Sequence, residues 1–339
     1  LRYGQDPSQG RYPGGEPGDE DVCRFTGEGH WAPHGLCAKA SGEAEDPHVY
    51  GDSAMITNNP MQLKARIKNL AAEKHLPAQI VLQNYLMERL LERLSLSSYR
   101  ENFIIKGGFL IAVMVGLESR STMDLDATIK GFTLNHESIR TVFEHVCTIK
   151  VDDDVTFSVN RVADIRETDD YPGIRVSLIA SYPPLRVPLS VDVTTGDKIT
   201  PREIEYSFPL LFDDRTISMM AYNLETILAE KLETILSRNI ANTRPRDFYD
   251  VYLLYSLRWG DCDLSLLSSA LERTAAKRGS ISLLTDYQTI MTNIRENPRM
   301  HDFWANYQKD FDYAREISFE ETCDTVLIIM QALKFEYSR

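Results

Sequence analysis

The stretch KGGFLIAVMVGLESRSTMDLD, residues 106–126, decides the fold of this chain. A glycine pair, Gly107 and Gly108, opens an apolar run that is typical of a buried helix. Two carboxylates, Asp124 and Asp126, follow with one residue between them. If both lie on a strand, the two-residue period of side chains puts them on the same face. The stretch therefore predicts a helix that begins at a glycine turn and leads to a strand with two neighbouring acids.

Two carboxylates held this close repel each other, and a hard divalent cation relieves the repulsion. Carboxylate oxygens suit Mg²⁺ or Mn²⁺, and Mg²⁺ usually arrives with substrate phosphates. Backbone N–H groups left bare at a helix start suit phosphate oxygens. Together these features indicate phosphoryl or nucleotidyl transfer. Each is weak alone, because Asp-x-Asp is common in surface loops and Gly-Gly often only allows tight helix packing.

A third acid is available on a later segment. Residues 185–193, LRVPLSVDV, form a β-branched run that predicts a strand, and Asp192 lies near its end. Sites that align an attacking and a leaving oxygen on metal ions need several converging carboxylates. The alternative is that Asp192 only starts the turn at 194–197, which Asp and Gly favour.

A helical segment further on carries a lysine that can bind phosphate. Residues 222–240 have apolar positions at helical spacing, with Lys231 in the middle. In residues 244–254, Asp247 and Asp250 are three apart and share a helix face. Lys231 can bind a triphosphate as a point charge, and Asp247 can orient Lys231 or act as a base. Alternatively, these charges form surface salt bridges of little energetic value.

Four separate motifs together resemble one family. KGG with R-x-T-x-D-L-D, the later strand Asp, the AEKLE helix and R-x-R-D-x-Y-D are similar in order and spacing to the AbiEii/AbiGii toxin family. These toxins, which include the MenT type, are nucleotidyltransferases of the DNA polymerase β superfamily. The resemblance runs from about Met55 to about Leu257, with a looser helical region after it.

The resemblance implies a role for each matching residue. It implies that the metal ligands are Asp124, Asp126 and Asp192, and that these acids are catalytic together with Lys231 and Asp247. It implies nucleotide binding by Lys106, Gly107, Gly108, Arg120, Thr122, Lys231 and Arg246, with Arg120 meeting phosphate.

The family also implies a biological role. The protein would be a bacterial toxin–antitoxin or phage-defence component that uses a nucleoside triphosphate and Mg²⁺ or Mn²⁺. Relatives add nucleotides to the 3′ end of tRNA, which blocks translation. The implied partner is an AbiEi-type antitoxin, with or without a stable complex. Two alternatives stay open: a nucleotidyltransferase acting on a small molecule or protein hydroxyl, and a non-catalytic protein that binds nucleotide or antitoxin.

Composition limits the possible classes. The formal net charge is −13, which argues against a surface coated for non-specific nucleic-acid binding but allows a local basic patch for tRNA. The longest apolar run, Phe109–Val115, is far shorter than the roughly 20 residues of a membrane-spanning helix. The five cysteines are dispersed and do not predict a disulfide framework. We therefore expect a cytoplasmic protein with no membrane association.

The first 54 residues differ from the rest. They hold ten of the 18 glycines and five of the 15 prolines, a composition that cannot bury a core. We expect residues 1–54 to be disordered or a mis-translated upstream segment, with Met55 as the true start. A weaker interpretation is a zinc site, although the spacing is not that of a familiar finger. Its ligands would be Cys23, His30, His34 and Cys37.

The remaining patterns predict an α+β fold. A mixed sheet with helices on one face would occupy residues 55–220 with two N-terminal helices. The family resemblance implies that this core is of the polymerase-β-like nucleotidyltransferase type. Residues 221–339 would form a C-terminal helical domain that completes the active site. We expect helices at 61–74, 77–95, 107–116 and 135–147, and strands at 103–106, 124–130, 154–163, 173–181, 185–193, 203–208 and 216–219.

Overall fold

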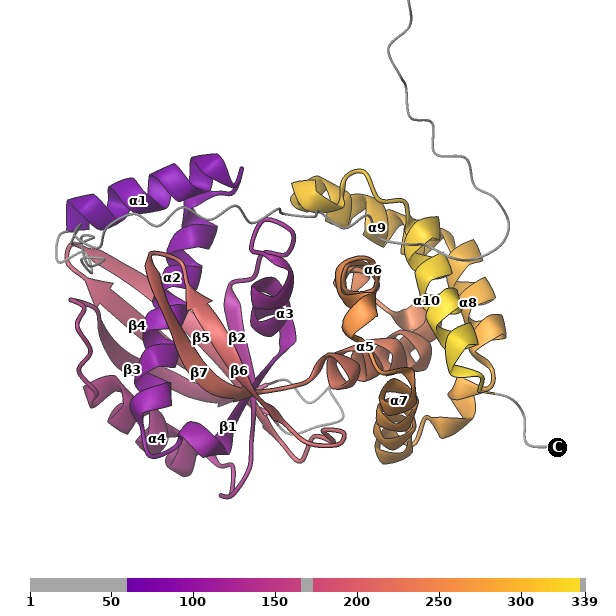
Figure 1. Ribbon diagram of the computed structural model, residues 1–339, viewed down its shortest axis with the longest axis horizontal. Coiled ribbons are helices and arrows are strands. Elements are labelled where there is room, and N and C mark those ends of the chain that lie inside the picture. Colours follow the sequence, from indigo (N-terminus) through magenta and orange to yellow (C-terminus); the bar gives the residue numbers. More distant parts are fainter. Residues whose placement is uncertain (1–59, 166–172, 336–339) are drawn as a thin grey trace, which may run out of the picture. The chain divides into compact units, whose positions relative to one another are not determined.

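The computed structural model describes residues 60–165 and 173–335 (Figure 1). Its sheet carries the predicted strand acids Asp124, Asp126 and Asp192. The expectations for residues 1–54, for a start at Met55 and for a zinc site lie outside the described residues. That proposed zinc set consists of Cys23, His30, His34 and Cys37.

Seven strands of the described chain form one mixed sheet in the order β3-β4-β5-β2-β1-β7-β6. Strands β1 and β7 pair in parallel, as do β2 and β5, whereas the other neighbours are antiparallel. The α+β class with a mixed sheet is thereby confirmed. The strands are β1 (Phe103–Lys106), β2 (Asp124–Ile129), β3 (Thr156–Asp164), β4 (Ile174–Tyr182), β5 (Leu185–Thr195), β6 (Ile204–Leu210) and β7 (Asp213–Ala221).

Helices begin where the sequence supplies caps. Asn135 and Ser138 form a reciprocal capping box, and Pro245 occupies a first helical turn where its missing N–H costs nothing. The first four helices are α1 (Pro60–Glu73), α2 (Ala78–Leu96), α3 (Gly107–Val115) and α4 (His136–Thr148). The C-terminal helical region, also as predicted, contains α5 (Leu224–Arg238), α6 (Pro245–Arg258), α7 (Leu264–Arg278), α8 (Tyr287–Glu296), α9 (Pro298–Asp310) and α10 (Phe319–Leu333).

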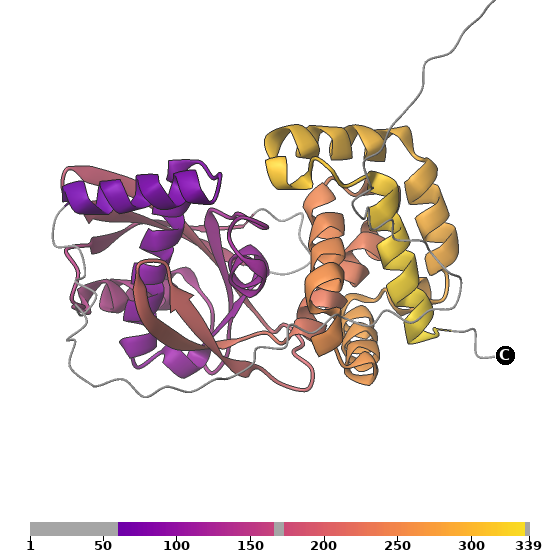
Figure 2. The same ribbon diagram turned by 45° about the horizontal axis from the view of Figure 1, so that its top comes forward.

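The two faces of the sheet differ in chemistry. Buried and more exposed side chains alternate along β4 and β5, with Val176, Leu178 and Val191 on the buried face. Helices α2 and α4 contact the sheet, and Figures 1 and 2 show α2 lying along the strands. Phe103 and Phe143 pack edge to face, with their ring centroids 5.8 Å apart. Burial of this apolar face leaves the opposite face of β2, β4 and β5 for polar side chains.

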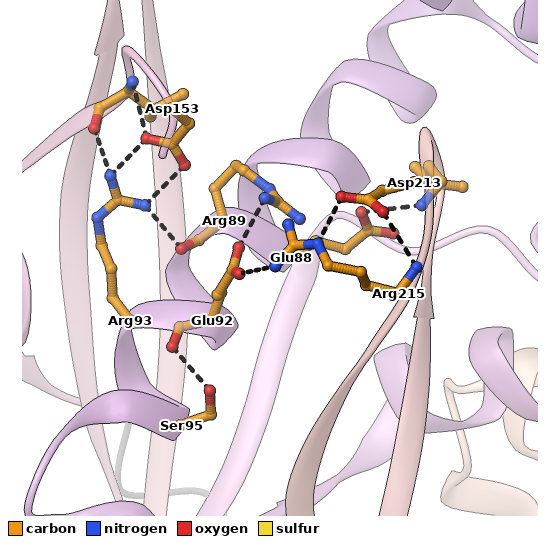
Figure 3. Close-up of polar contacts among 10 residues, drawn as sticks. Glu88, Arg89, Glu92, Arg93, Ser95, Asp153, Asp213 and Arg215 are labelled. Carbon is orange, nitrogen blue, oxygen red and sulfur yellow. Dashed lines mark hydrogen bonds and ion pairs between the residues drawn. The ribbon is translucent and has the colours of Figure 1, made fainter. Parts of the chain in front are cut away.

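Helix α2 buries charged side chains as well as apolar ones (Figure 3). Arg93 donates to both carboxylate oxygens of Asp153, at 3.0 and 2.6 Å, and both side chains are almost fully buried. Arg89 donates to Glu92 at 2.6 Å, and Glu92 also accepts from Arg215 on β7 at 2.8 Å. Because a lone buried charge is strongly unfavourable, this pairing is what allows α2 to pack against the sheet.

Glu88 on the same helix is held differently. Its Oε2 accepts a hydrogen bond from the backbone N–H of Leu211 at 3.1 Å, just beyond β6. Burial raises the pKa of Glu88 to about 8, although the Leu211 N–H and Arg89 oppose this shift. The neutral carboxyl group is therefore the preferred form of Glu88 near neutral pH.

The C-terminal helices share an aromatic core. Trp304 and Tyr307 are buried, and their ring centroids lie 5.7 Å apart. Tyr249 on α6 packs with Tyr307 and donates from its hydroxyl to the backbone oxygen of Ser119 at 2.6 Å. This contact fixes α6 against the segment between α3 and β2. Within the described ranges, no helix is long and apolar enough to cross a membrane.

Candidate active site

The glycine turn brings the start of α3 directly over a strand carboxylate. Gly107 has φ +68°, and a Cβ at this position would lie 2.1 Å from Oδ2 of Asp126. Only glycine fits both the left-handed backbone and this close approach. The backbone N–H of Gly108 donates to Asp126 Oδ2 at 3.3 Å, and a Cβ on Gly108 would meet Thr122 Oγ1 at 3.0 Å. The two glycines thus allow the side chains of Asp126 and Thr122 to approach the helix start closely.

Strand register brings the three predicted acids together. Asp126 on β2 is paired directly with Asp192 on β5, and Asp124 lies two residues along the same strand. Directly paired residues point to the same face with their Cβ atoms about 4.5–5.5 Å apart. Burial raises the pKa of Asp126; Lys106 opposes the shift and Asp192 adds to it. Burial also raises the pKa of Asp124, and Asp192 again adds to the effect. The acids therefore repel one another.

Arg175 on β4 holds the third acid, a contact that the sequence analysis missed. Its Nε and Nη2 donate to Oδ1 and Oδ2 of Asp192, both at 2.7 Å. The sequence gives only the short segment between the predicted strands 173–181 and 185–193, which suits a hairpin. The register of that hairpin sets Arg175 opposite Asp192. Among the described residues, no group of three or more His, Cys, Asp or Glu side chains is arranged to hold a metal ion. A cation bound by all three acids would share the Asp192 carboxylate with Arg175, either through a lone pair that the guanidinium leaves free or by replacing it on one oxygen.

The donor set nevertheless fits a hard divalent cation. Asp124, Asp126 and Asp192 offer carboxylate oxygens alone, which is the chemistry that Mg²⁺ and Mn²⁺ prefer. The pKa values of Asp124 and Asp126 are raised mainly by burial, and the negative charge of Asp192 adds to both shifts. A dication would offset this negative charge.

Lys231 lies in a buried ion network on α5 and α6. Its Nζ is 2.6 Å from Asp247 Oδ1 and 2.7 Å from Asp250 Oδ2. Arg244 reaches Asp247 at 3.0 Å, and Arg120 reaches Asp250 at 2.6 Å. Both aspartates have no exposed surface. These pairs are therefore not the weak surface salt bridges of the alternative interpretation, and Asp247 is placed to orient Lys231.

Arg120 was predicted to meet phosphate, and in the structure it forms an ion pair with Asp250. Its side chain is only 7% exposed. Burial alone would raise the pKa of Asp250, but Arg120 and Lys231 lower it to about 2. Arg120 Nη2 also lies 3.2 Å from where a Cβ of Gly108 would be. Arg120 therefore links the ion network of α5 and α6 to the glycine turn. Its contact with phosphate stays a prediction.

Lys106 is held by a residue that the sequence analysis did not select. Its Nζ lies 2.5 Å from Asp197 Oδ2, which also accepts from Thr194 Oγ1 at 2.8 Å. Burial alone would raise the pKa of Asp197, but Lys106 lowers it to about 2. Asp197 lies in the turn after β5, where Gly and Asp predict a turn but give no sign of a lysine partner.

One cavity of about 320 Å³ is lined by all the catalytic, metal-binding and nucleotide-binding residues that the family resemblance implies. Cations of the helical region, including Arg238 and Arg278, line it together with the strand acids. A volume in this range fits a small-molecule ligand. The selected residues that line it are Lys106, Gly107, Gly108, Arg120, Thr122, Asp124, Asp126, Asp192, Lys231, Arg246 and Asp247.

The fold and this cavity define the class of a nucleotidyltransferase. The family model "Nucleotidyl transferase AbiEii toxin, Type IV TA system" matches residues 89–325, and the chain belongs to this family. The resemblance found in the sequence is thereby confirmed, and the protein is an enzyme of the nucleotidyltransferase class. Such enzymes generally use a nucleoside triphosphate and a divalent cation, and a type IV toxin implies an antitoxin partner.

Two solved structures from Helicobacter pylori resemble the chain. One, described as a candidate nucleotidyltransferase, is 15% identical, with a TM-score of 0.44, and the match covers 76% of this chain and 96% of that one. The other is JHP933, at 13% identity and a TM-score of 0.41, with 76% and 93% covered. A comparison with curated proteins gives no match.

Proposed function

We propose that this protein is the toxin of a bacterial toxin–antitoxin system and acts in phage defence. In the cytoplasm it transfers a nucleotide from a nucleoside triphosphate to the 3′ end of tRNA, releases pyrophosphate and so blocks translation. The observation that carries the proposal is the cavity that collects all eleven selected residues, with strand acids and helix cations lining it.

The glycine turn supports binding of the triphosphate. Gly107 and Gly108 open α3, and the start of a helix favours a bound anion. The Gly108 N–H is hydrogen-bonded to Asp126 Oδ2, so a phosphate would share or replace that carboxylate there. The absence of side chains at these two positions lets a phosphate approach the backbone. The hydroxyl of Thr122 lies beside the same space and can donate to a phosphate oxygen.

The helical region supplies positive charge. Lys231 and Arg246 line the cavity, and Asp247 with Asp250 fixes the position of the Lys231 ammonium group. These cations neutralise negative charge on the departing pyrophosphate. In phosphoryl chemistry such positioning and electrostatic stabilisation provide most of the catalysis.

The strand acids would hold the divalent cation. Asp124, Asp126 and Asp192 are its proposed ligands, and the cation when bound supplies Lewis-acid polarisation and charge neutralisation. Asp192 is nearest to the open part of the sheet face, next to Arg175. A carboxylate oxygen of Asp192, once released from Arg175, accepts the proton of the attacking 3′-hydroxyl.

A label-transfer assay tests the proposal. Purified protein, Mg²⁺ and total bacterial tRNA are incubated with each α-labelled nucleoside triphosphate in turn. We expect label in the tRNA band with wild-type protein and none with Asp126→Asn, whose folding is checked by thermal unfolding. Label on protein instead would assign a protein hydroxyl as acceptor. A complete lack of label would contradict the RNA acceptor and favour a small molecule or a binding role.

A further inference from the structure

A row of four paired residues crosses the sheet at the active site. Lys106 pairs with Asp126, Asp126 with Asp192, and Asp192 with Arg175, so that β1, β2, β5 and β4 each contribute one side chain. Directly paired residues share a face. The glycine turn and its phosphate space adjoin the Lys106 end of the row. Arg175 is at the other end, where the sheet continues through β4 to its edge strand β3.

Beyond this row, and within residues 60–165 and 173–335, none of the residues that register places on the same face of β3, β4 and β5 is buried. In these ranges α2 and α4 pack against the sheet, and the polar face is left accessible. We call this surface the arginine–serine face. Its members are Thr156, Ser158, Arg161, Ala163, Arg175, Ser177, Ile179, Ser181, Arg186, Pro188, Ser190 and Asp192.

The charge of this face is opposite to that of the whole chain, which is −13. Arg161 and Arg186 are exposed, and the described part of the chain gives neither an ion-pair partner. Asp192 is the sole acid that these three strands place on the face. Asp164 at the end of β3 pairs with Ile174 of the buried side, and its carboxylate bonds His136 at the start of α4.

We propose that the arginine–serine face binds the phosphodiester backbone of a single-stranded nucleic-acid acceptor whose 3′ end lies at Asp192. This inference rests on the proposed function and adds the surface that holds the acceptor. Arginine guanidinium groups and serine hydroxyls are the side chains that commonly contact phosphate oxygens. Both occur here on one accessible surface that leads directly to the third acid.

The size of the face favours a chain of nucleotides over a small acceptor. Arg186 lies six residues from Asp192 along β5, which is about 20 Å at the rise of a strand. Arg161 is one strand beyond β4, opposite Ser177. No single small molecule reaches all of these positions together with the active site, whereas several successive phosphates do. The triphosphate has its own space at the other end of the row.

Binding of a blocked RNA tests the inference without catalysis. The probe is a fluorescent single-stranded RNA of about 12 nucleotides with a 3′-deoxy end, and its affinity is measured by anisotropy over a range of salt. We compare Arg161→Ala/Arg186→Ala with Arg273→Ala/Arg299→Ala, a control that removes two exposed arginines from α7 and α9. Thermal unfolding and the KM for the nucleoside triphosphate verify that each variant keeps its fold and active site.

We expect the first double variant to bind the RNA at least tenfold more weakly and the control to stay within twofold of wild type. Since each phosphate contact on a single strand contributes about 0.7 to the slope of log affinity against log salt, the slope should fall by about 1.4. Arg161→Lys/Arg186→Lys keeps the charges and should restore most of the slope. Arg161→Gln/Arg186→Gln replaces the alanine variant if that one unfolds.

Unchanged affinity and salt slope in the alanine and glutamine variants would overturn the inference. Loss of antitoxin binding with RNA binding intact would assign the face to a protein partner, and would overturn it too. These outcomes are separate from failure of the proposed function. A wild-type protein that labels tRNA keeps that function even if the arginine–serine face proves irrelevant to RNA binding.

Discussion

The two charged walls of the cavity are built in opposite ways. On the sheet, burial raises the pKa values of Asp124 and Asp126, and the neighbouring Asp192 carboxylate raises them further. On α5 and α6, Asp247 and Asp250 are fully buried, yet cations within 3.0 Å pair each of them. Under the proposed function, the sheet carboxylates are the metal ligands and the helix carboxylates hold the cations in place, and the substitutions below should separate these two roles.

The largest effect is expected at the sheet. Asp126→Asn keeps the shape of the side chain but removes a proposed metal ligand, and should lower transfer on the order of 10²–10³-fold or more. Because the pKa of Asp126 is raised, the neutral amide should leave the free energy of unfolding unchanged or slightly higher. Transfer assays and urea unfolding measure the two effects. A variant with full activity would remove the metal-site claim.

The same change from Asp to Asn on α6 should affect stability more than the change at Asp126 does. Asp250→Asn leaves Arg120 and Lys231 without one carboxylate in a fully buried site, and should destabilise the fold by about 3–5 kcal/mol. Denaturant unfolding at neutral pH measures this loss. If Asp250→Asn and Asp126→Asn were equally stable, the contrast between scaffold and binding acids would be wrong.

Gly107→Ala tests how closely the helix start approaches Asp126. Left-handed backbone at φ +68° costs alanine about 1–2 kcal/mol, and the new Cβ would also collide with the Asp126 carboxylate. Gly279→Ala is the matched control, because Gly279 has φ +70° with no heavy atom near a Cβ. We expect Gly107→Ala to lose more unfolding free energy than the control and most of its transfer activity. Equal losses would mean that the close approach has no cost.

The smallest effect on transfer activity is expected away from the cavity, at Glu88. An acid with its pKa raised to about 8 in the fold, against about 4.3 unfolded, binds more protons when folded. The contribution of Glu88 to the free energy of unfolding is then fully present below about pH 4.3 and is lost as the pH rises towards 8. Glu88→Gln should remove this slope, whereas the exposed control Glu272→Gln should keep it. Unfolding free energies measured between pH 5 and 8 give this slope. Identical slopes in Glu88→Gln and Glu272→Gln would contradict a raised pKa of Glu88.

The sequence predicted what depends on local period and on motifs. The two-residue period of Asp124–Asp126, the helical spacing around Lys231 and the β-branched run before Asp192 gave elements whose boundaries agree with the structure to within a few residues. The three acids then meet because the sheet pairs β2 with β5, and Lys231 lines the same cavity from α5.

What the sequence could not predict depends on pairings between distant segments. Arg175 holds Asp192 through strand register, and Asp197 holds Lys106 from a turn 91 residues away. The buried charges of α2 look like a solvated helix face until Asp153 and Arg215 are brought against them (Figure 3). Neither period nor composition encodes such contacts.

The most direct test of the central claim is whether transfer requires a 3′-hydroxyl on RNA. Wild-type protein is given the labelled nucleoside triphosphate that reacts best, with either intact tRNA or tRNA oxidised by periodate, which lacks this hydroxyl. The account predicts label in intact tRNA, pyrophosphate release that depends on it, and neither with oxidised tRNA. Equal labelling of the oxidised tRNA, or of protein without any RNA, would contradict it.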